Sequence, residues 1–319
     1  TATGNTESGI VLDSSSNNNL LGNIATGNGY GIYLDSSSNN AISGNTASDN
    51  DFGIRLESSN DNTISGNTAN DNTESGIYLG SSNNNTISEN TASGNNFGIS
   101  FNSSSNNTVS GNTINDNNYH GLDLYSSSNS NTISGNTATG NIDIGIRLDL
   151  SSDNAISGNN ATGNADGIQL KSSNSNTISG NTFAGNYYFG IYLYSSSNSN
   201  TLSGNTATGN RIFGIYLSSS SSNTIIDNTA TSSLYYGIYF DSSSNSNTLS
   251  GNIATGNGCG IYLRFSNNNT LSGNIATGNG CGIYHELSSN NILSGNIATS
   301  NSIGIYLDSS SGNSTLSGN

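Results

Sequence analysis

The chain has 319 residues and a net charge of -15, from five Lys and Arg against twenty Asp and Glu, with 40 Gly and no Pro, Met or Trp. A charge of this sign repels nucleic acid and anionic lipid, which argues against nucleic-acid binding. No stretch approaches the roughly 20 apolar residues of a membrane span, and no basic and apolar signal peptide opens the chain. Because the first residue is not Met, we expect a processed product or a segment of a longer protein.

A repeat of 22 to 24 residues runs along the whole chain. Its GIYL-like segment begins with a Gly that recurs fourteen times, from Gly9 to Gly304, and its SGN-like segment also recurs fourteen times. One-residue changes in length fall only in the Ser/Asn run and just after TGN, so both places are predicted turns. Ile and Leu of GIYL stand two apart, the period of a strand with one buried face, and TIS adds an inward aliphatic such as Ile64 or Leu202.

These spacings predict an all-β fold, a right-handed single-stranded parallel β-helix (β-solenoid) of about fourteen rungs of 22 to 24 residues. A rung is one full turn of the solenoid and holds about three short strands. Leucine-rich repeats need more Leu and a helical return, and left-handed β-helices use hexapeptide units, so neither fits. We expect one repeat domain over residues 1–319. Neither end has the polar cap that normally closes a repeat rod, which predicts a longer array or head-to-tail stacking.

Runs such as NTISGNTATGN (131–141), GIYLDSSSNN (31–40) and NTLSGNIATGNGCGIYL (247–263) resemble the parallel β-helix repeats of large archaeal cell-surface proteins. The same repeat occurs in the periplasmic copper-site maturation protein NosD. The resemblance covers the whole chain and implies the fold. It is weak for function, because this repeat serves adhesins, surface-layer components and polysaccharide-active enzymes.

Three columns of Asn run along the chain. They lie in SGN in all fourteen rungs, in TGN in thirteen, and before TIS from Asn18 to Asn291. Stacked amides can donate and accept hydrogen bonds along the solenoid, and Asn tolerates the left-handed backbone of tight bends, so a structural role is predicted. The SGN column is complete, and its members are Asn23, Asn45, Asn67, Asn90, Asn112, Asn136, Asn159, Asn181, Asn205, Asn228, Asn252, Asn274, Asn296 and Asn319.

No group of residues predicts a catalytic or cofactor site. A copper site would need Cys, Met or His, but Met is absent and His120 and His285 lie seven rungs apart. Polysaccharide lyases and hydrolases need clustered acids and bases. The best such patch is Asp123, Arg147 and Asp149, which we interpret as a stacked surface ion pair.

Asp13, Asp35 and Glu57 form one outward column of like charges. A bound calcium ion would relieve their repulsion, and the alternative is a solvated acidic edge.

The third residue of the GIYL segment varies between rungs, and it is Tyr in the last six rungs. This stripe either packs on itself or forms a lateral interface for another rod or a sugar chain, and consists of Tyr192, Tyr216, Tyr239, Tyr262, Tyr284 and Tyr306.

Cys259 and Cys281 stand in one column on neighbouring rungs, close enough for a disulfide, while two buried thiols in an otherwise aromatic column are the alternative. Six sequons permit N-glycosylation without implying it, because several arise by chance in a chain rich in Asn and Ser. They begin at Asn84, Asn102, Asn106, Asn160, Asn268 and Asn313.

The sequence therefore predicts an extracellular, cell-surface structural protein without enzymatic activity. Its expected partner is itself, stacked head to tail and bundled laterally into a filament, sheath or surface layer. The alternative is a carbohydrate-binding or polysaccharide-cleaving surface module, which would make glycans the partner.

Overall fold

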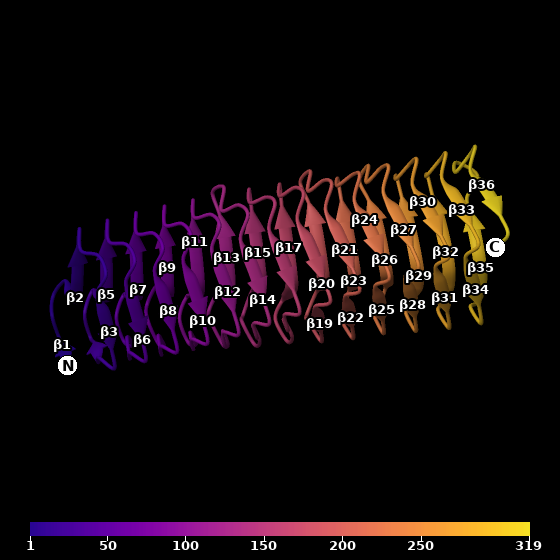
Figure 1. The fold of residues 1–319 in the computed structure, drawn as a ribbon. Coiled ribbons are helices and arrows are strands. Elements are labelled where there is room, and N and C mark those ends of the chain that lie inside the picture. The colour runs from indigo at the N-terminus through magenta and orange to yellow at the C-terminus, as the bar shows by residue number, and fades with distance from the viewer. The chain divides into compact units, whose positions relative to one another are not determined.

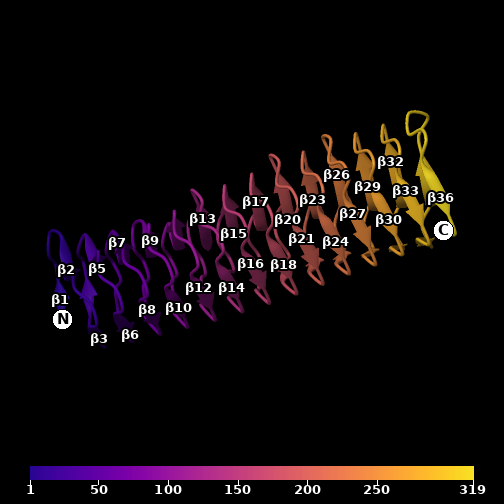
Figure 2. The same ribbon diagram turned by 45° about the horizontal axis from the view of Figure 1, so that its top comes forward.

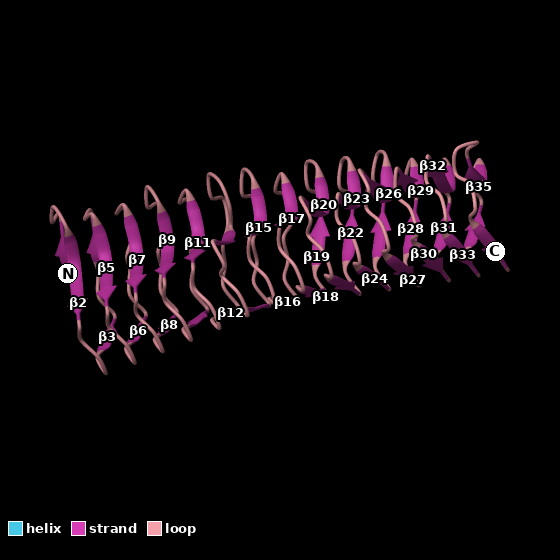
Figure 3. Cartoon of the chain, turned by 90° about the horizontal axis from the view of Figure 1, so that it is seen from above, coloured by secondary structure: helices cyan, strands magenta, loops and turns pink.

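The computed structural model describes all 319 residues, which form strands, turns and loops without a helix (Figure 3). Contacts divide the chain into two compact units, an N-terminal unit of Thr1–Asn160 and a C-terminal unit of Ala161–Asn319. Each unit holds seven rungs of a parallel β-solenoid, about fourteen rungs in all, as the sequence predicts. A single repeat domain over the whole chain stays a prediction.

The GIYL-like segments of the N-terminal unit form one parallel sheet (Figure 1). Its strands are β2 (Ser8–Asp13), β5 (Tyr30–Asp35), β7 (Phe52–Glu57), β9 (Ser75–Gly80), β11 (Phe97–Asn102), β13 (Leu122–Tyr125) and β15 (Ile144–Asp149). The TIS-like segments form a second parallel sheet. It consists of β3 (Asn19–Leu21), β6 (Ala41–Ser43), β8 (Thr63–Ser65), β10 (Thr86–Ser88), β12 (Thr108–Ser110), β14 (Thr132–Ser134) and β16 (Ala155–Ser157).

The C-terminal unit repeats both sheets (Figure 2). The GIYL-like strands are β17 (Asp166–Lys171), β20 (Phe189–Tyr194), β23 (Phe213–Ser218), β26 (Tyr236–Asp241), β29 (Cys259–Arg264), β32 (Cys281–Glu286) and β35 (Ile303–Leu307). The TIS-like strands are β18 (Thr177–Ser179), β21 (Thr201–Ser203), β24 (Thr224–Ile226), β27 (Thr248–Ser250), β30 (Thr270–Ser272), β33 (Ile292–Ser294) and β36 (Thr315–Ser317).

The third strand of each rung differs between the units. In the C-terminal unit it forms a six-stranded parallel sheet of β19 (Thr182–Ala184), β22 (Thr206–Thr208), β25 (Thr229–Thr231), β28 (Ile253–Thr255), β31 (Ile275–Thr277) and β34 (Ile297–Thr299). In the N-terminal unit only β1 (Ala2–Thr3) and β4 (Ala25–Thr26) pair as strands, and isolated bridges such as Thr46 with Thr68 continue the column. The prediction of about three strands in each rung therefore holds for six of the seven rungs of the C-terminal unit.

Aliphatic columns fill the core of each unit. In the rungs between the first and the last, the inward Ile and Leu of GIYL and the central residue of TIS are fully buried, including Ile64 and Leu202. Register is kept from rung to rung, as where Ile54 of β7 pairs with Ile77 of β9. Because a shift of one residue would turn every inward side chain outward, this buried face fixes the register.

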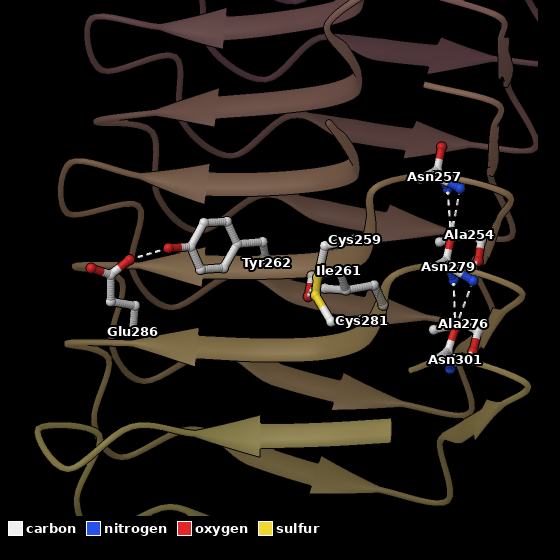
Figure 4. The surroundings of a disulfide bond; sticks show 10 residues. All are labelled: Ala254, Asn257, Cys259, Ile261, Tyr262, Ala276, Asn279, Cys281, Glu286 and Asn301. Carbon is white, nitrogen blue, oxygen red and sulfur yellow. Dashed lines mark hydrogen bonds between the residues drawn. A yellow bond between two sulfur atoms is a disulfide. The ribbon is translucent and has the colours of Figure 1, made fainter. Parts of the chain in front are cut away.

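Stacked Asn side chains form hydrogen-bonded ladders along the turns between strands. The Asn136 amide illustrates the pattern, since its oxygen accepts from the backbone N and from Nδ2 of Asn112, at 3.0 and 2.9 Å. Its nitrogen donates to the Val109 carbonyl and to Asn159 Oδ1, both at 3.0 Å. The TGN column behaves alike, and Figure 4 shows Asn257, Asn279 and Asn301 joined in this way. Each amide thus satisfies turn groups that the core hides from water.

Two Gly columns have different causes. A Cβ on the Gly that opens GIYL would collide with the next rung, since at Gly53 it would lie 2.5 Å from the Gly76 carbonyl oxygen. The Gly of SGN instead has a left-handed backbone, with φ of 61° at Gly66. In two rungs Glu89 and Asp227 adopt φ values of 56° and 53° at that position, so it tolerates a side chain at some strain.

Candidate functional site

A hollow of about 300 Å³ opens on the outer face of the GIYL-like sheet in the N-terminal unit. It exists because small residues interrupt the outward columns. Ser75 stands between Phe52 and Phe97 in one column, and Ser100 follows Tyr78 in the next. The aromatic side chains are left as walls on either side of the space that the serines do not fill.

Three charged residues lie at one end of the hollow. Asp123 of β13 is in register with Arg147 of β15, and the two form an ion pair of 3.0 Å between Oδ1 and Nη1. The other terminal nitrogen, Nη2, binds Asp149 Oδ2 at 2.5 Å. The predicted ion pair is present, but it is not fully on the surface, because Asp123 is only 3% exposed and its carboxylate is held inside the wall of the hollow.

Burial raises the pKa of the Asp123 carboxyl to about 6, although the Arg147 charge and hydrogen bond act in the opposite direction. Asp123 therefore exchanges its proton in the near-neutral range, where a general acid is effective. Tyr125 lines the same hollow, and burial followed by the effect of Tyr78 raises the pKa of its phenol, so it stays protonated.

His120 borders this group and packs edge-on against Phe97, with ring centroids 5.6 Å apart. Its Nδ1 lies 3.5 Å from Asp143 Oδ2 but makes no hydrogen bond. Burial, and then the charge of Arg147, lowers the pKa of His120 to about 4, so the imidazole is neutral. His120 therefore contributes no positive charge to the site.

The charge of the hollow is negative. Glu74, Asp123 and Asp149 line it against the single cation Arg147, whose guanidinium already binds two carboxylates. The arrangement supplies a titratable acid, a second carboxylate and aromatic walls. It offers no free cation to an anionic ligand.

The acidic column is aligned as predicted, since Asp13 pairs with Asp35 and Asp35 with Glu57 in the strand register. The Glu57 carboxylate is bound to Arg55, with 2.7 Å between Oε1 and Nη2. The structure gathers no group of three or more His, Cys, Asp or Glu that could hold a metal ion. The calcium hypothesis thus has no supporting cluster and stays untested by binding.

The tyrosine stripe is packed on itself in the C-terminal unit. Tyr192 and Tyr216 stack 4.8 Å apart with rings 1° from parallel, and Tyr284 and Tyr306 stack equally closely. Tyr239 and Tyr262 are only 6% and 8% exposed, so the stripe is less outward than the sequence suggested. A lateral interface there stays a prediction.

Cys259 and Cys281 pair in register and form a disulfide, with 4.5 Å between their Cα atoms (Figure 4). The alternative of two free thiols is not what the structure contains.

Four sequon asparagines share one exposed turn position with φ of 57° or 58°, namely Asn84, Asn106, Asn268 and Asn313. Asn160 is also exposed and Asn102 is half-buried.

A family profile matches most of the chain. The profile of the family described as periplasmic copper-binding protein (NosD) matches residues 1–141 and 214–319. The chain belongs to the NosD family. The profile of the right-handed beta helix region also matches residues 98–230, so the resemblance to parallel β-helix repeats is confirmed. An archaeal source stays a prediction, and a search of curated proteins gave no match.

Several solved structures share the fold of this NosD-family chain. The Azotobacter vinelandii mannuronan C-5 epimerase AlgE6 A-module matches with a TM-score of 0.72 and 15% identity over 90% of both chains. A mutant of the periplasmic alginate epimerase AlgG gives 0.55 and 16% over 90% of this chain and 76% of that one. The Dettilon tailspike protein gives 0.61 and 17% over 76% and 60%.

These similarities contradict the prediction that the chain is not an enzyme, because the AlgE6 A-module and AlgG are named as epimerases. The reason for the error is that the sequence places Asp123, Arg147 and Asp149 on a surface that the structure shows to be hollowed. At such low identity the likeness establishes the fold. An activity of this NosD-family chain must be argued from its own residues.

The family description implies copper, and the donor set of this chain does not fit it. Copper sites draw on Cys, Met and His. Met is absent, Cys259 and Cys281 are joined in a disulfide, and His120 and His285 belong to different units. We therefore derive no step through copper for this NosD-family chain.

The compartment follows in part from the same facts. The NosD family is described as periplasmic, and disulfides persist in oxidising compartments outside the cytoplasm. The structure contains no helix that could cross a membrane. These observations fit an exported protein.

Proposed function

We propose that the chain binds and hydrolyses a neutral polysaccharide in the hollow of the N-terminal unit. The observation that carries this proposal is the buried Asp123 carboxyl, whose pKa is raised to about 6 and which shares the Arg147 guanidinium with a second carboxylate, Asp149. Aromatic walls from Phe52, Tyr78 and Phe97 supply the apolar faces on which sugar rings pack.

The chemistry uses the two carboxylates in different roles. Because both bind one guanidinium, they lie no more than about 8 Å apart, which is within the reach of about 9.5 Å used by glycoside hydrolases. Asp123 donates its proton to the glycosidic oxygen, and the bond from that oxygen to the anomeric carbon breaks. Asp149 takes a proton from the water that adds to the anomeric carbon. Arg147 positions both carboxylates.

Charge selects the substrate class. At neutral pH the hollow carries more carboxylates than cations, and the whole chain has a net charge of -15. A polyuronate such as alginate would be repelled, and Arg147 is already occupied by Asp123 and Asp149. A neutral glycan meets no such penalty, so we expect a preference opposite to the substrate named for the epimerases.

The natural place for this reaction is outside the cell, where polysaccharides of walls and matrices lie. The disulfide and the periplasmic family support export, and attachment at the cell surface is part of the proposal. Release of product into that space requires no cofactor.

The experiment is a substrate panel. The purified chain is incubated with neutral polysaccharides (starch, dextran, β-glucan and xylan) and with alginate and polygalacturonate, and new reducing ends are measured. We expect reducing ends from at least one neutral polymer and none from the polyuronates. Cleavage confined to polyuronates, or no cleavage of any polymer at acidic to neutral pH, would contradict the proposal.

A further inference from the structure

A second hollow, of about 370 Å³, lies on the outer face of the C-terminal unit over β26, β29 and β32. Its walls include Tyr236, Tyr262 and Tyr284, and the Cys259–Cys281 disulfide forms part of its floor. No charged side chain lines it. It belongs to a different unit from the Asp123 site and takes no part in the proposed hydrolysis.

This hollow occupies the volume of two missing aromatic rings. In the preceding rungs Phe189 stacks on Phe213 at 5.3 Å, and Phe213 on Tyr236 at 5.1 Å, each pair within 8° of parallel. The next two residues in register are Cys259 and Cys281, whose side chains are turned into the disulfide (Figure 4). The stack therefore ends at Tyr236 and leaves room beyond it.

The residue before each cysteine widens the same space. Gly258 and Gly280 stand where Tyr235 stands in the preceding rung, and a Cβ on either glycine would lie 2.5 Å from a backbone carbonyl oxygen. The outer tyrosine stripe also changes here. Its rings are nearly parallel as far as Tyr262, which is then tilted 54° from Tyr284.

The shape and chemistry suit a flat ring with apolar faces and a polar edge. The Tyr262 hydroxyl donates to Glu286 Oε2 (Figure 4). Arg264 Nε lies 3.6 Å from the same oxygen. The tyrosines that line the hollow carry hydroxyls, which can donate to and accept from the hydroxyls at the edge of a ring. The volume lies near the lower end of the range of about 300 to 1,000 Å³ that is usual for small-ligand pockets.

We infer that this hollow is a non-catalytic binding site for one or two pyranose rings of a neutral polysaccharide. The inference rests on the proposed function for its choice of a glycan over an aromatic side chain of a protein partner. A second site on the same chain would hold the polymer while the Asp123 site cleaves it, and would raise the effective concentration of substrate.

The test fills the hollow with the residue type that the column carries elsewhere. The double variant Cys259→Phe with Cys281→Phe continues the stack of Phe189, Phe213 and Tyr236, whereas Cys259→Ala with Cys281→Ala removes the disulfide but leaves the space open. Thermal unfolding followed by circular dichroism checks that both variants fold. Binding is measured as retardation in native gels that contain starch, dextran, β-glucan or xylan.

We expect the Phe pair to weaken retardation by the bound polymer about tenfold, because the ring-stacking surface is lost. The Ala pair should bind like the parent chain, and both pairs should cleave short oligosaccharides at the parent rate. Equal binding by the Phe pair and the parent, or an equal loss in both pairs, would overturn the inference. So would the absence of retardation by every polymer, or loss of self-association alone in the Phe pair.

The failure of this inference is distinguishable from failure of the proposed function. Asp123→Asn should abolish cleavage and leave retardation intact. If the parent chain cleaves nothing but its retardation disappears in the Phe pair, the glycan site stands and the hydrolase proposal fails. If cleavage depends on Asp123 and the Phe pair is retarded normally, the hydrolase proposal stands and the second site does not.

Discussion

Arg55 and Arg147 stand at the same position of their rungs, and each binds the acidic residue two places later, Glu57 or Asp149. Their other neighbours differ. The Arg55 guanidinium lies within 6 Å of four aromatic rings, among them Tyr30 at 5.0 Å, whereas Arg147 meets the buried carboxylate of Asp123. Arg55 therefore forms a structural ion pair with one carboxylate. Arg147 binds two, because the adjacent strand adds Asp123.

The pH dependence of hydrolysis follows from the same acid. Cleavage needs protonated Asp123, whose pKa in the folded chain is about 6. The rate should therefore fall as pH rises through about 6, by about tenfold for each further pH unit. Initial rates of reducing-end release between pH 4 and 9 measure this, and a rate that stays constant up to pH 8 would exclude Asp123 as the acid.

His285 provides a residue-scale prediction about stability. It is fully buried in a Leu column, between Leu263 and Leu307, and neither ring nitrogen has a hydrogen-bond partner. Burial lowers its pKa from 6.5 to about 4, so the unfolded chain binds the proton more tightly. The free energy of unfolding therefore keeps its full value above pH 6.5. It falls progressively as the pH drops toward 4, by roughly 3 kcal/mol.

His285→Leu should remove that loss and also relieve two unsatisfied nitrogens. Its thermal midpoint at pH 7 should rise, and the midpoint should change less between pH 7 and 4 than in the parent chain. Circular dichroism melts at several pH values provide the measurement. A lower midpoint at pH 7 would mean that the imidazole has a partner in solution.

At the scale of the element, the ladders and the register were predictable and the hollow was not. The identical spacing of Asn136 and its equivalents indicates stacking because every rung repeats the same turn. The hollow depends on Ser75 and Ser100 being small beside Phe97 and Tyr78, a difference of volume across neighbouring rungs. Comparing side-chain size down each outward column is the signal that would have located it.

Asn136→Ala tests what a ladder contributes. The change removes the donor and the acceptor of one amide and leaves partners such as the Val109 carbonyl unsatisfied inside the unit. We expect a cost of about 2 to 4 kcal/mol. Asn118→Ala is the matched control, since Asn118 is exposed and its side chain only meets Asn96.

Hydrogen exchange of the flanking rungs measures the effect, because a repeat array need not unfold in two states. Faster exchange should be confined to rungs near Asn136. Equal exchange in the two variants would show that the amide ladder adds little beyond the aliphatic core.

For the whole molecule, the repeat predicted the solenoid class because each rung is read from the same short pattern, and membership of the NosD family agrees. Function was not predictable in the same way. The absence of clustered acids in the sequence led to a structural role. The rung spacing already places Asp123 beside Arg147, 24 positions later, and the structure has them in that register. Spacing alone does not report how deeply they are buried.

Head-to-tail association remains a prediction of this scale. Ile303 and Leu316 in the last rung are each 47% exposed, and β36 is the last strand in the order of its sheet. Sedimentation velocity at increasing concentration should show a growing mass if rungs stack between copies. A single monomeric species at the highest concentration would contradict it.

The most direct test of the proposed function compares Asp123→Asn with Glu57→Gln on the neutral polymer that the chain cleaves best. Glu57 occupies the same rung position as Asp149 and binds Arg55, but the residue in register with Arg55 on the preceding strand is Tyr33, where Arg147 has Asp123. Reducing-end release should fall by at least about a hundredfold in Asp123→Asn, the usual scale for loss of a general acid, and stay near the parent rate in Glu57→Gln. Equal rates in Asp123→Asn and the parent chain would contradict the account.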